Sequence, residues 1–196
     1  LLETLPEREY RSGWAEIIKH GLIEPSTPAG DSGLFSLIAA NAPALRDRTS
    51  PLLPAIISRN VAIKASVVQA DEREAGLRAI LNFGHTIGHA VEAAGYQMLH
   101  GEAISVGLHG AMRLGAELGR VAEEDVGRVV ATLRDFGLPV EAVVDAESVR
   151  RLMLHDKKRV SGEQQWILPN PDGGVEIVRG VPDAAIERAI AAVIRS

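Results

Sequence analysis

Apolar side chains recur every three to four residues along most of this chain, the spacing that places them on one face of an α-helix. Glycine and proline interrupt the pattern and end the predicted segments. The predicted helices cover residues 12–23, 33–45, 51–70, 79–94, 101–119, 123–136, 146–155 and 182–195. The pattern therefore predicts a mainly α protein built as a multihelical array.

The period changes near the C-terminus, where QQWIL and VEIVR flank the turn-forming segment PNPDGG. This arrangement predicts a small β-hairpin. The segment EPSTPAGDSG, residues 24–33, is rich in turn formers and is predicted to be a surface loop. The sequence contains no G-x-G-x-x-G phosphate loop, so it predicts no dinucleotide-binding unit within these residues.

Composition limits the kinds of ligand the protein can bind. The 196 residues are 46% hydrophobic and 24% charged, which is typical of a water-soluble globular domain. The net charge of −5 argues against nucleic acid and anionic membrane as partners, so an anionic ligand must meet a local cluster of cations. The chain lacks cysteine, and any metal must therefore be held by histidine and carboxylate.

Sequence features also suggest the cellular location of the protein and the origin of this chain. No apolar run approaches the roughly 18 residues of a membrane span, and no signal peptide is visible. We therefore expect a cytoplasmic protein. The chain begins at Leu1 rather than at methionine, and a fragment or processed domain is the simplest interpretation.

The segment LNFGHTIGHA places polar residues in an otherwise small and apolar stretch. On a continuous helix turning about 100° per residue, the side chains in this region fall within an arc of about 60°. The four residues of this row are Arg78, Asn82, His85 and His89. The row predicts one wall of a binding site. In the alternative interpretation, Asn82 and His89 are hydrogen-bonded core groups that mainly support stability.

Two other predicted helices carry charged residues among apolar ones. Lys64 lies within about 60° of Ile57, Val61 and Val68 on a helix, so it is predicted to sit within an apolar stripe. Buried lysines need a partner, although the stem of Lys64 could also lie on the core while its ammonium group reaches water. On the helix that begins the chain, a polar sector faces either solvent or a cleft; its members are Glu16, Lys19 and His20.

The polar residues suggest a metal site, but spacing alone leaves its ligands open. Glu16, His85 and His100 could offer two imidazoles and one carboxylate to Zn²⁺ and leave a position open for substrate. His85 and His89, four residues apart, form the more obvious pair.

Four segments carry a resemblance to a known family. They are RSGWAEIIKHGLI, IKASVVQADEREAGLRAILNFGHTIGHAVE, LHGEAISVG, and MLHDKK followed by WILP, in that order. Together they resemble the C-terminal domain of 3-dehydroquinate synthase over essentially the whole chain. The resemblance implies that residues 1–196 form one helical metal- and substrate-binding domain. It also implies that the family's N-terminal NAD-binding α/β domain is absent from this chain.

The resemblance implies a role for each candidate site residue. The family's metal ligands map onto Glu16, His85 and His100, with Zn²⁺ or Co²⁺ as the expected ion. His89 then becomes a hydrogen-bonding or proton-transfer group near the substrate rather than a ligand. The remaining substrate-contacting positions, several of them expected to be catalytic, are Lys19, Lys64, Arg78, Asn82 and one of Lys157 and Lys158.

The implied reaction converts 3-deoxy-arabino-heptulosonate 7-phosphate to 3-dehydroquinate and phosphate, a step of the shikimate pathway. Zinc would polarise an alcohol that NAD⁺ transiently oxidises, and the new ketone would acidify the neighbouring C–H so that phosphate is eliminated. The isolated chain is expected to be inactive, and the whole enzyme to be a homodimer. Two alternatives remain: a related cyclase, such as 2-deoxy-scyllo-inosose or 2-epi-5-epi-valiolone synthase, and a metal-binding helical domain without catalysis.

Overall fold

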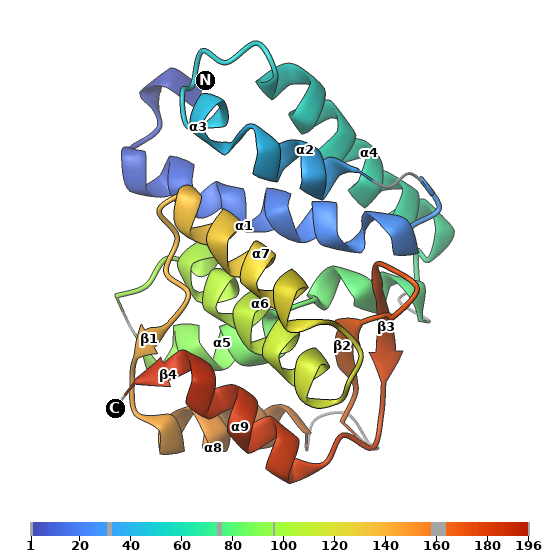
Figure 1. Cartoon of the computed structure of the whole chain (residues 1–196), viewed down its shortest axis with the longest axis vertical. Helices are drawn as coiled ribbons and strands as arrows, with labels where there is room; N and C mark the ends of the chain where they lie inside the picture. The colour runs from blue at the N-terminus through green and yellow to red at the C-terminus, as the bar shows by residue number, and fades with distance from the viewer. Residues whose placement is uncertain (1, 31–32, 74–75, 96, 158–163, 196) are drawn as a thin grey trace.

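The computed structural model describes residues 2–30, 33–73, 76–95, 97–157 and 164–195, with the side chains of 154–157 left out. It confirms the predicted mainly α architecture with a small C-terminal hairpin (Figure 1). The longer helices are α1 (Glu7–Ile23), α4 (Leu53–Ala70), α5 (His85–Ala94), α6 (His100–Glu117), α7 (Glu123–Asp135), α8 (Ala146–Lys157) and α9 (Asp183–Val193). The shorter ones are α2 (Leu34–Ala40), α3 (Ala42–Leu45) and the 3₁₀ helices η1 (Leu2–Thr4), η2 (Glu24–Ser26) and η3 (Leu77–Asn82).

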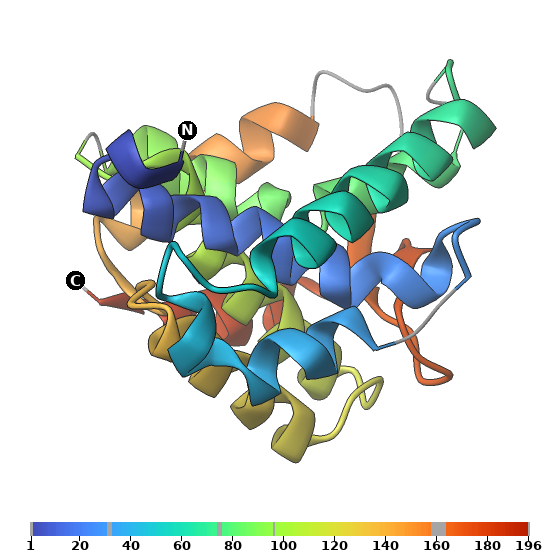
Figure 2. The same cartoon turned by 90° about the horizontal axis from the view of Figure 1, so that it is seen from above.

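Helix α6 lies at the centre of the array and packs against α1, α5, α7 and α9. Most of its residues are buried, as expected for a helix that is apolar on nearly all sides. Helix α1 crosses the middle of the molecule, with α2, α3 and α4 on one side of it and α8 and α9 at the opposite end (Figure 1). Seen from above, α4 runs outward beside the end of α1 (Figure 2).

Aromatic packing fixes α1 against the end of α7. The rings of Trp14 and Phe136 stack with their centroids 4.3 Å apart, and both side chains are buried. Such a pair contributes about 0.5–1.5 kcal/mol beyond the area it buries. This contact helps to hold the helix that carries Glu16 in one position.

The predicted hairpin forms between β2 (Trp166–Pro169) and β3 (Val175–Val178), which pair antiparallel. A second strand pair was not predicted. It is the parallel pair of β1 (Ala142–Val143) and β4 (Ile194–Arg195). The last predicted helix therefore ends at Val193, two residues early, because the chain becomes extended at Ile194. Strands of two residues are too short to leave a periodic signal.

The predicted helix over 79–94 is wrong as a continuous element. The chain instead forms the 3₁₀ helix η3, a turn at Phe83 and Gly84, and then α5. Gly84 adopts the left-handed region, with φ of 78°, which favours glycine. A Cβ there would also lie 2.9 Å from the Leu108 backbone nitrogen. This break turns the chain so that α5 starts at His85.

The predicted helix over 33–45 is also divided, into α2 and α3. Pro43 lies at the start of α3 and cannot donate the backbone hydrogen bond that a continuous helix requires. The segment predicted to be a surface loop does not begin at the surface, because Glu24 is 1% exposed. Its carboxylate pairs with Arg59 and accepts the Leu34 backbone N–H, which ties the end of α1 to α4 and α2.

The apolar stripe predicted around Lys64 does not face the core. The buried positions of α4 are Leu53, Ile56, Ile63 and Val67. Ile57 and Val61 are 38% and 63% exposed, and Lys64 is exposed beside them. The sequence pattern contained two apolar arcs on this helix, and the prediction followed the wrong one.

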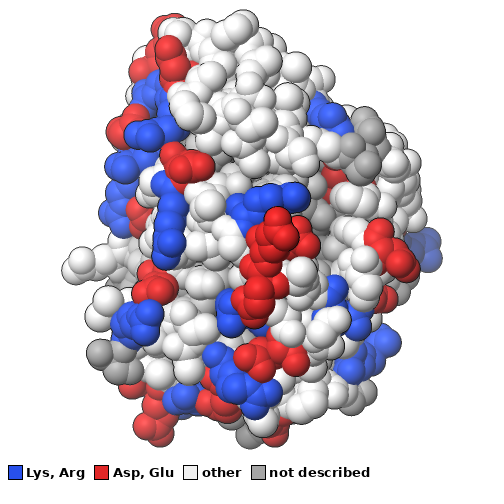
Figure 3. Space-filling view, in the orientation of Figure 1, with Lys and Arg blue, Asp and Glu red and all other residues white. Residues whose placement is uncertain are grey.

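The surface carries mixed charge on the face seen in Figure 3, where basic and acidic side chains lie next to one another. The upper centre of that face is mainly uncharged, whereas its left edge carries both basic and acidic side chains. Among the described helices, none has the length and hydropathy needed to cross a membrane.

Candidate metal and substrate site

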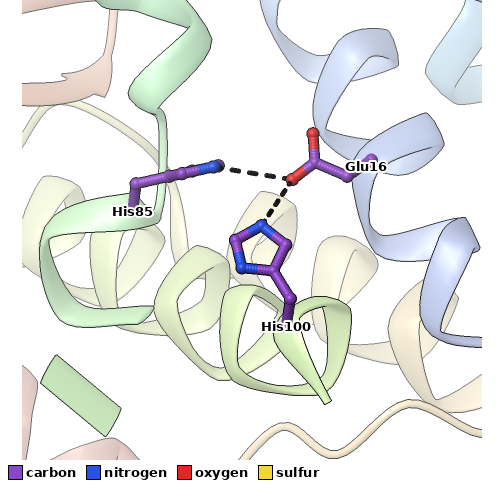
Figure 4. A group of neighbouring side chains, drawn as sticks. All are labelled: Glu16, His85 and His100. Atoms are coloured by element: carbon purple, nitrogen blue, oxygen red, sulfur yellow. Dashed lines mark ion pairs between the residues drawn. The ribbon is translucent and has the colours of Figure 1, made fainter. Parts of the chain in front are cut away.

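Three helices bring one carboxylate and two imidazoles together. Glu16 lies on α1, His85 begins α5 and His100 begins α6 (Figure 4). Glu16 Oε1 is 3.5 Å from His85 Nε2 and 3.6 Å from His100 Nε2. The three residues form one of the two clusters of possible metal ligands among the residues with described side chains. The predicted set Glu16, His85 and His100 is therefore brought together in space.

Hydrogen bonds decide which imidazole nitrogens face the centre of this cluster. His85 Nδ1 donates to the Phe83 carbonyl at 3.1 Å, because a carbonyl oxygen can only accept. His100 Nδ1 lies 3.0 Å from the Glu92 carboxylate, which likewise accepts when ionised. In its neutral form with the proton on Nδ1, each ring presents an unprotonated Nε2 to Glu16.

These lone pairs fit a metal ion. Glu16 Oε1 is buried and has no hydrogen-bond partner among the described residues, although buried polar atoms are almost always paired. Two nitrogens and one oxygen bearing lone pairs thus point at one another, which is unfavourable unless a cation lies between them. Ligand atoms about 2.0–2.2 Å from a tetrahedral Zn²⁺ are about 3.3–3.6 Å apart, which matches the observed separations.

The ionisation states in the cluster suit metal binding. Burial, together with the charge of nearby Lys19, lowers the pKa of His85 to about 4, so the ring is neutral at pH 7. Burial raises the pKa of Glu16, but the charge and hydrogen bond of Lys19 outweigh it, and the pKa of this carboxyl lies below its ordinary value. A neutral imidazole and an ionised carboxylate are the forms that bind metal.

Lys19 links the metal-ligand cluster to a cationic pocket. Its ammonium group is 2.6 Å from Glu16 Oε2, and the residue is 3% exposed. Burial lowers the pKa of Lys19, and the Glu16 carboxylate opposes this shift. Sequence alone left open whether the helical sector of Glu16, Lys19 and His20 faces solvent or a cleft. A solvent-facing sector is excluded, because Lys19 and His20 are both buried.

The pocket has a volume of about 550 Å³ and lies between α1, α4 and the segment from η3 to α5. Its charged and polar lining residues are Glu16, Lys19, His20, Lys64, Arg78, Asn82, His85 and His100. Asp71 fixes one wall, since its carboxylate accepts the backbone N–H groups of Gly76 and Arg78 at 2.9 Å each. Among the described residues that line the cavity, three are cationic and one is a carboxylate.

Most, but not all, of the predicted substrate residues line this pocket. Lys19, Lys64, Arg78 and Asn82 do so. His89 is exposed and is not part of the lining, although its ring centroid is 5.0 Å from that of His85. Lys158 lies outside the described residues, and Lys157 ends α8 with its side chain likewise not described.

The exposure of Asn82 and His89 excludes the alternative in which they are core groups. The predicted row of four polar residues on one helix is also wrong, because two of them lie on η3 and two on α5. Arg78, Asn82 and His85 still reach a common pocket, through the turn at Gly84.

His20 lines the pocket but was given no role from sequence. It is 5% exposed, its Nδ1 lies 3.0 Å from Asn60 Oδ1, and burial and the nearby Lys19 lower its pKa. The available signal was its place in the same helical sector as Glu16 and Lys19.

A larger cavity, of about 690 Å³, lies elsewhere, between α1, α2, α7 and the hairpin. Its walls include Phe35, Met112 and Val129, and its lining contains no histidine or lysine among the described residues. The smaller pocket, which is lined by histidines and lysines, is therefore the better candidate for the functional site.

The fold and the site define a helical domain with a candidate metal centre beside a cationic pocket. A family model described as "3-dehydroquinate synthase C-terminal" matches residues 13–159. This chain belongs to that family.

Curated relatives agree with this assignment. The chain is 45% identical over 181 residues to a 3-dehydroquinate synthase of Geobacter metallireducens, covering 91% of this chain and 49% of the relative. It is 42% identical over 193 residues to a 3-dehydroquinate synthase of Acetivibrio thermocellus, covering 97% and 52%. The chain thus spans about half the length of these relatives.

Solved structures of related cyclases share the fold. One is 2-epi-5-epi-valiolone synthase from Streptomyces hygroscopicus with NAD⁺ and Zn²⁺ bound, with a TM-score of 0.85 and 29% identity over 98% of this chain and 53% of that one. A 2-deoxy-scyllo-inosose synthase, complexed with carbaglucose-6-phosphate, NAD⁺ and Co²⁺, gives a TM-score of 0.69 at 23% identity, covering 97% and 54%. The second likeness concerns the fold alone.

Proposed function

We propose that this chain is the zinc- and substrate-binding domain of a 3-dehydroquinate synthase. The whole enzyme would convert 3-deoxy-arabino-heptulosonate 7-phosphate to 3-dehydroquinate and phosphate. One observation carries the proposal: the buried Glu16 Oε1, which has no hydrogen-bond partner among the described residues, faces two imidazole nitrogens. It lies at the edge of a pocket whose described lining includes Lys19, Lys64 and Arg78.

The metal-binding part of the proposal assigns Glu16, His85 and His100 as ligands. A zinc or cobalt ion supplies a Lewis acid that polarises a substrate oxygen, and NAD⁺ supplies a hydride acceptor. The residues present leave at least one coordination position for substrate, as catalytic zinc requires. Their fixed tautomers orient the ligand atoms before the ion binds.

The cationic groups would bind the anionic substrate. Arg78 can hold a carboxylate or phosphate through two parallel hydrogen bonds, whereas a lysine acts as a point charge. Lys19 and Lys64 face the same cavity, and Lys157 or Lys158 would add a further cation. Asn82 would orient a substrate hydroxyl, and His89 would hold or move a proton at the rim of the site.

The proposal extends to partners beyond this chain. An N-terminal NAD-binding domain would complete the site, which is supported by the relatives' greater length. Without that domain we expect these residues to bind neither NAD⁺ nor substrate productively. A cytoplasmic homodimer remains part of the proposal.

A related cyclase is the second candidate, since 2-epi-5-epi-valiolone synthase shares the fold with a TM-score of 0.85. The higher identity to 3-dehydroquinate synthases, 42–45% against 29%, favours the first candidate. The two differ in substrate, so the direct test is turnover by the protein at its full natural length. Phosphate release from the heptulosonate phosphate supports the first candidate. Reaction only with the substrates of cyclitol-forming cyclases would contradict it.

A further inference from the structure

We propose that Glu92 is a positioning residue of the metal site, holding the His100 ring so that its Nε2 faces Glu16 and His85. This inference rests on the proposed function, because it assumes that the three ligands bind a metal. Glu92 lies on α5 and its Oε2 is 3.0 Å from His100 Nδ1. Glu92 is neither one of the three proposed metal ligands nor one of the proposed substrate-binding residues.

The ring of His100 needs such a restraint more than that of His85. His100 has a side chain that is 47% exposed, against 13% for His85. His85 is held by the backbone carbonyl of Phe83, whose place is fixed by the turn into α5. For His100, the carboxylate of Glu92 is the only acceptor recorded at Nδ1 among the described residues.

The geometry also assigns the tautomer of the ligand. An ionised carboxylate accepts a hydrogen bond, so Glu92 favours the form of His100 with the proton on Nδ1 and the lone pair on Nε2. The lone pair then points toward Glu16 Oε1, 3.6 Å away. A carboxylate bonded to the outer nitrogen of a metal-bound imidazole also raises its basicity as a ligand. Helix α5 thus supplies one ligand, His85, and orients another.

A competing arrangement uses Glu92 as a ligand itself. His89, Glu92 and His100 form the second cluster of possible ligand atoms among the described side chains. In that arrangement Glu92 Oε2 and His100 Nδ1 would share an ion. The observed 3.0 Å contact is instead a normal hydrogen-bond length, with the donor and acceptor matched. The geometry therefore favours the positioning role.

The test is zinc affinity, measured by competition with a chromophoric chelator on the protein at its full natural length. Glu92→Ala is expected to weaken zinc binding by about 10- to 100-fold, the range found when a partner of this kind is removed. Glu92→Gln, whose amide oxygen can still accept from Nδ1, should restore much of the loss. The melting temperature of the metal-free protein should change little, because Glu92 is partly exposed.

A matched control is Glu117→Ala on α6, which removes a carboxylate paired with Arg188 instead. It should leave zinc affinity unchanged. Wild-type affinity in Glu92→Ala would overturn the inference while leaving the proposed function standing. Two zinc ions per wild-type chain, falling to one in Glu92→Ala, would also overturn it by making Glu92 a ligand. A wild-type protein that binds no zinc would overturn both proposals.

Discussion

Gly101 and Ser12 hold α6 and α1 in direct backbone contact. The Gly101 N–H donates to Ser12 Oγ at 3.1 Å, and a Cβ on Gly101 would lie 2.0 Å from the Ser12 carbonyl oxygen. Gly101 directly follows His100, and Ser12 lies one helical turn before Glu16. The absence of a side chain at one position therefore sets the distance between two proposed metal ligands.

Gly101→Ala should damage both stability and metal binding. The added methyl group cannot fit against the Ser12 backbone, so α1 and α6 must separate, at a cost of about 1–3 kcal/mol in the free energy of unfolding. The same movement should weaken zinc binding, since it carries His100 away from Glu16. Chemical denaturation and chelator competition measure the two effects.

Gly127→Ala is the control for that substitution. Gly127 lies within α7, and a Cβ there would meet nothing within 4 Å. Alanine should therefore raise the free energy of unfolding by about 0.5–1 kcal/mol, because it favours the helix. Equal effects of the two substitutions would show that the close approach at Gly101 does not constrain the site.

Asn82→Ala and His89→Ala should separate catalysis from stability. Both residues are exposed, so neither substitution should change the melting temperature appreciably. Each should lower kcat/KM by at least about tenfold, equivalent to about 1.4 kcal/mol of transition-state stabilisation. Normal kinetics in both variants would show that Asn82 and His89 do not contribute to catalysis. The functional residues would then be the metal ligands and the cations of the pocket.

The order of helices and the C-terminal hairpin could be predicted from sequence because they depend on local periodicity and turn chemistry. The break at Gly84 could not be predicted, because the sequence GHT at residues 84–86, within an apolar segment, is also compatible with a continuous helix. The break depends on a tertiary contact, because Gly84 packs against Leu108 of α6, which is distant in the sequence. Helix α4 illustrates the same limit, since periodicity does not reveal which apolar arc, Ile56–Ile63 or Ile57–Val61, meets the rest of the protein.

The ligand set followed from the family resemblance rather than from spacing, which favoured His85 with His89. Spacing failed because the ligands come from three helices, and their meeting depends on packing between α1, α5 and α6. The hydrogen bond from His100 to Glu92 crosses between two of those helices, so it left no local pattern to detect.

The ligand assignment predicts the effect of single substitutions on bound zinc. Glu16→Ala, His85→Ala and His100→Ala should each lose most of the bound metal, since each removes one of three protein ligands. His89→Ala should retain it. Plasma emission spectroscopy after dialysis measures the metal content. Retention in His85→Ala together with loss in His89→Ala would reverse the assignment.

Stability should fall as the pH is lowered below neutrality. Burial lowers the pKa of His109 below its ordinary value of 6.5, although its hydrogen bond to the Val140 carbonyl opposes the shift. Below about pH 6.5 the unfolded chain therefore binds a proton that the folded state does not, so the free energy of unfolding falls. The lowered pKa values of the buried His20 and the partly buried His85 act in the same direction.

Urea denaturation between pH 8 and pH 5, in the presence of a metal chelator, measures this dependence. His109→Asn can still donate to Val140 but does not titrate, so its stability should depend less steeply on pH. An unchanged pH dependence in this variant would show that His109 does not contribute.

The most direct test of the metal site is an anomalous difference map from crystals grown with zinc, recorded at the zinc absorption edge. The account predicts one peak per chain, within about 2.0–2.2 Å of Glu16 Oε1, His85 Nε2 and His100 Nε2. In the same map, Glu92 should remain hydrogen-bonded to His100 Nδ1 without contacting the ion. A peak between His89, Glu92 and His100, or no peak near Glu16, would contradict the account.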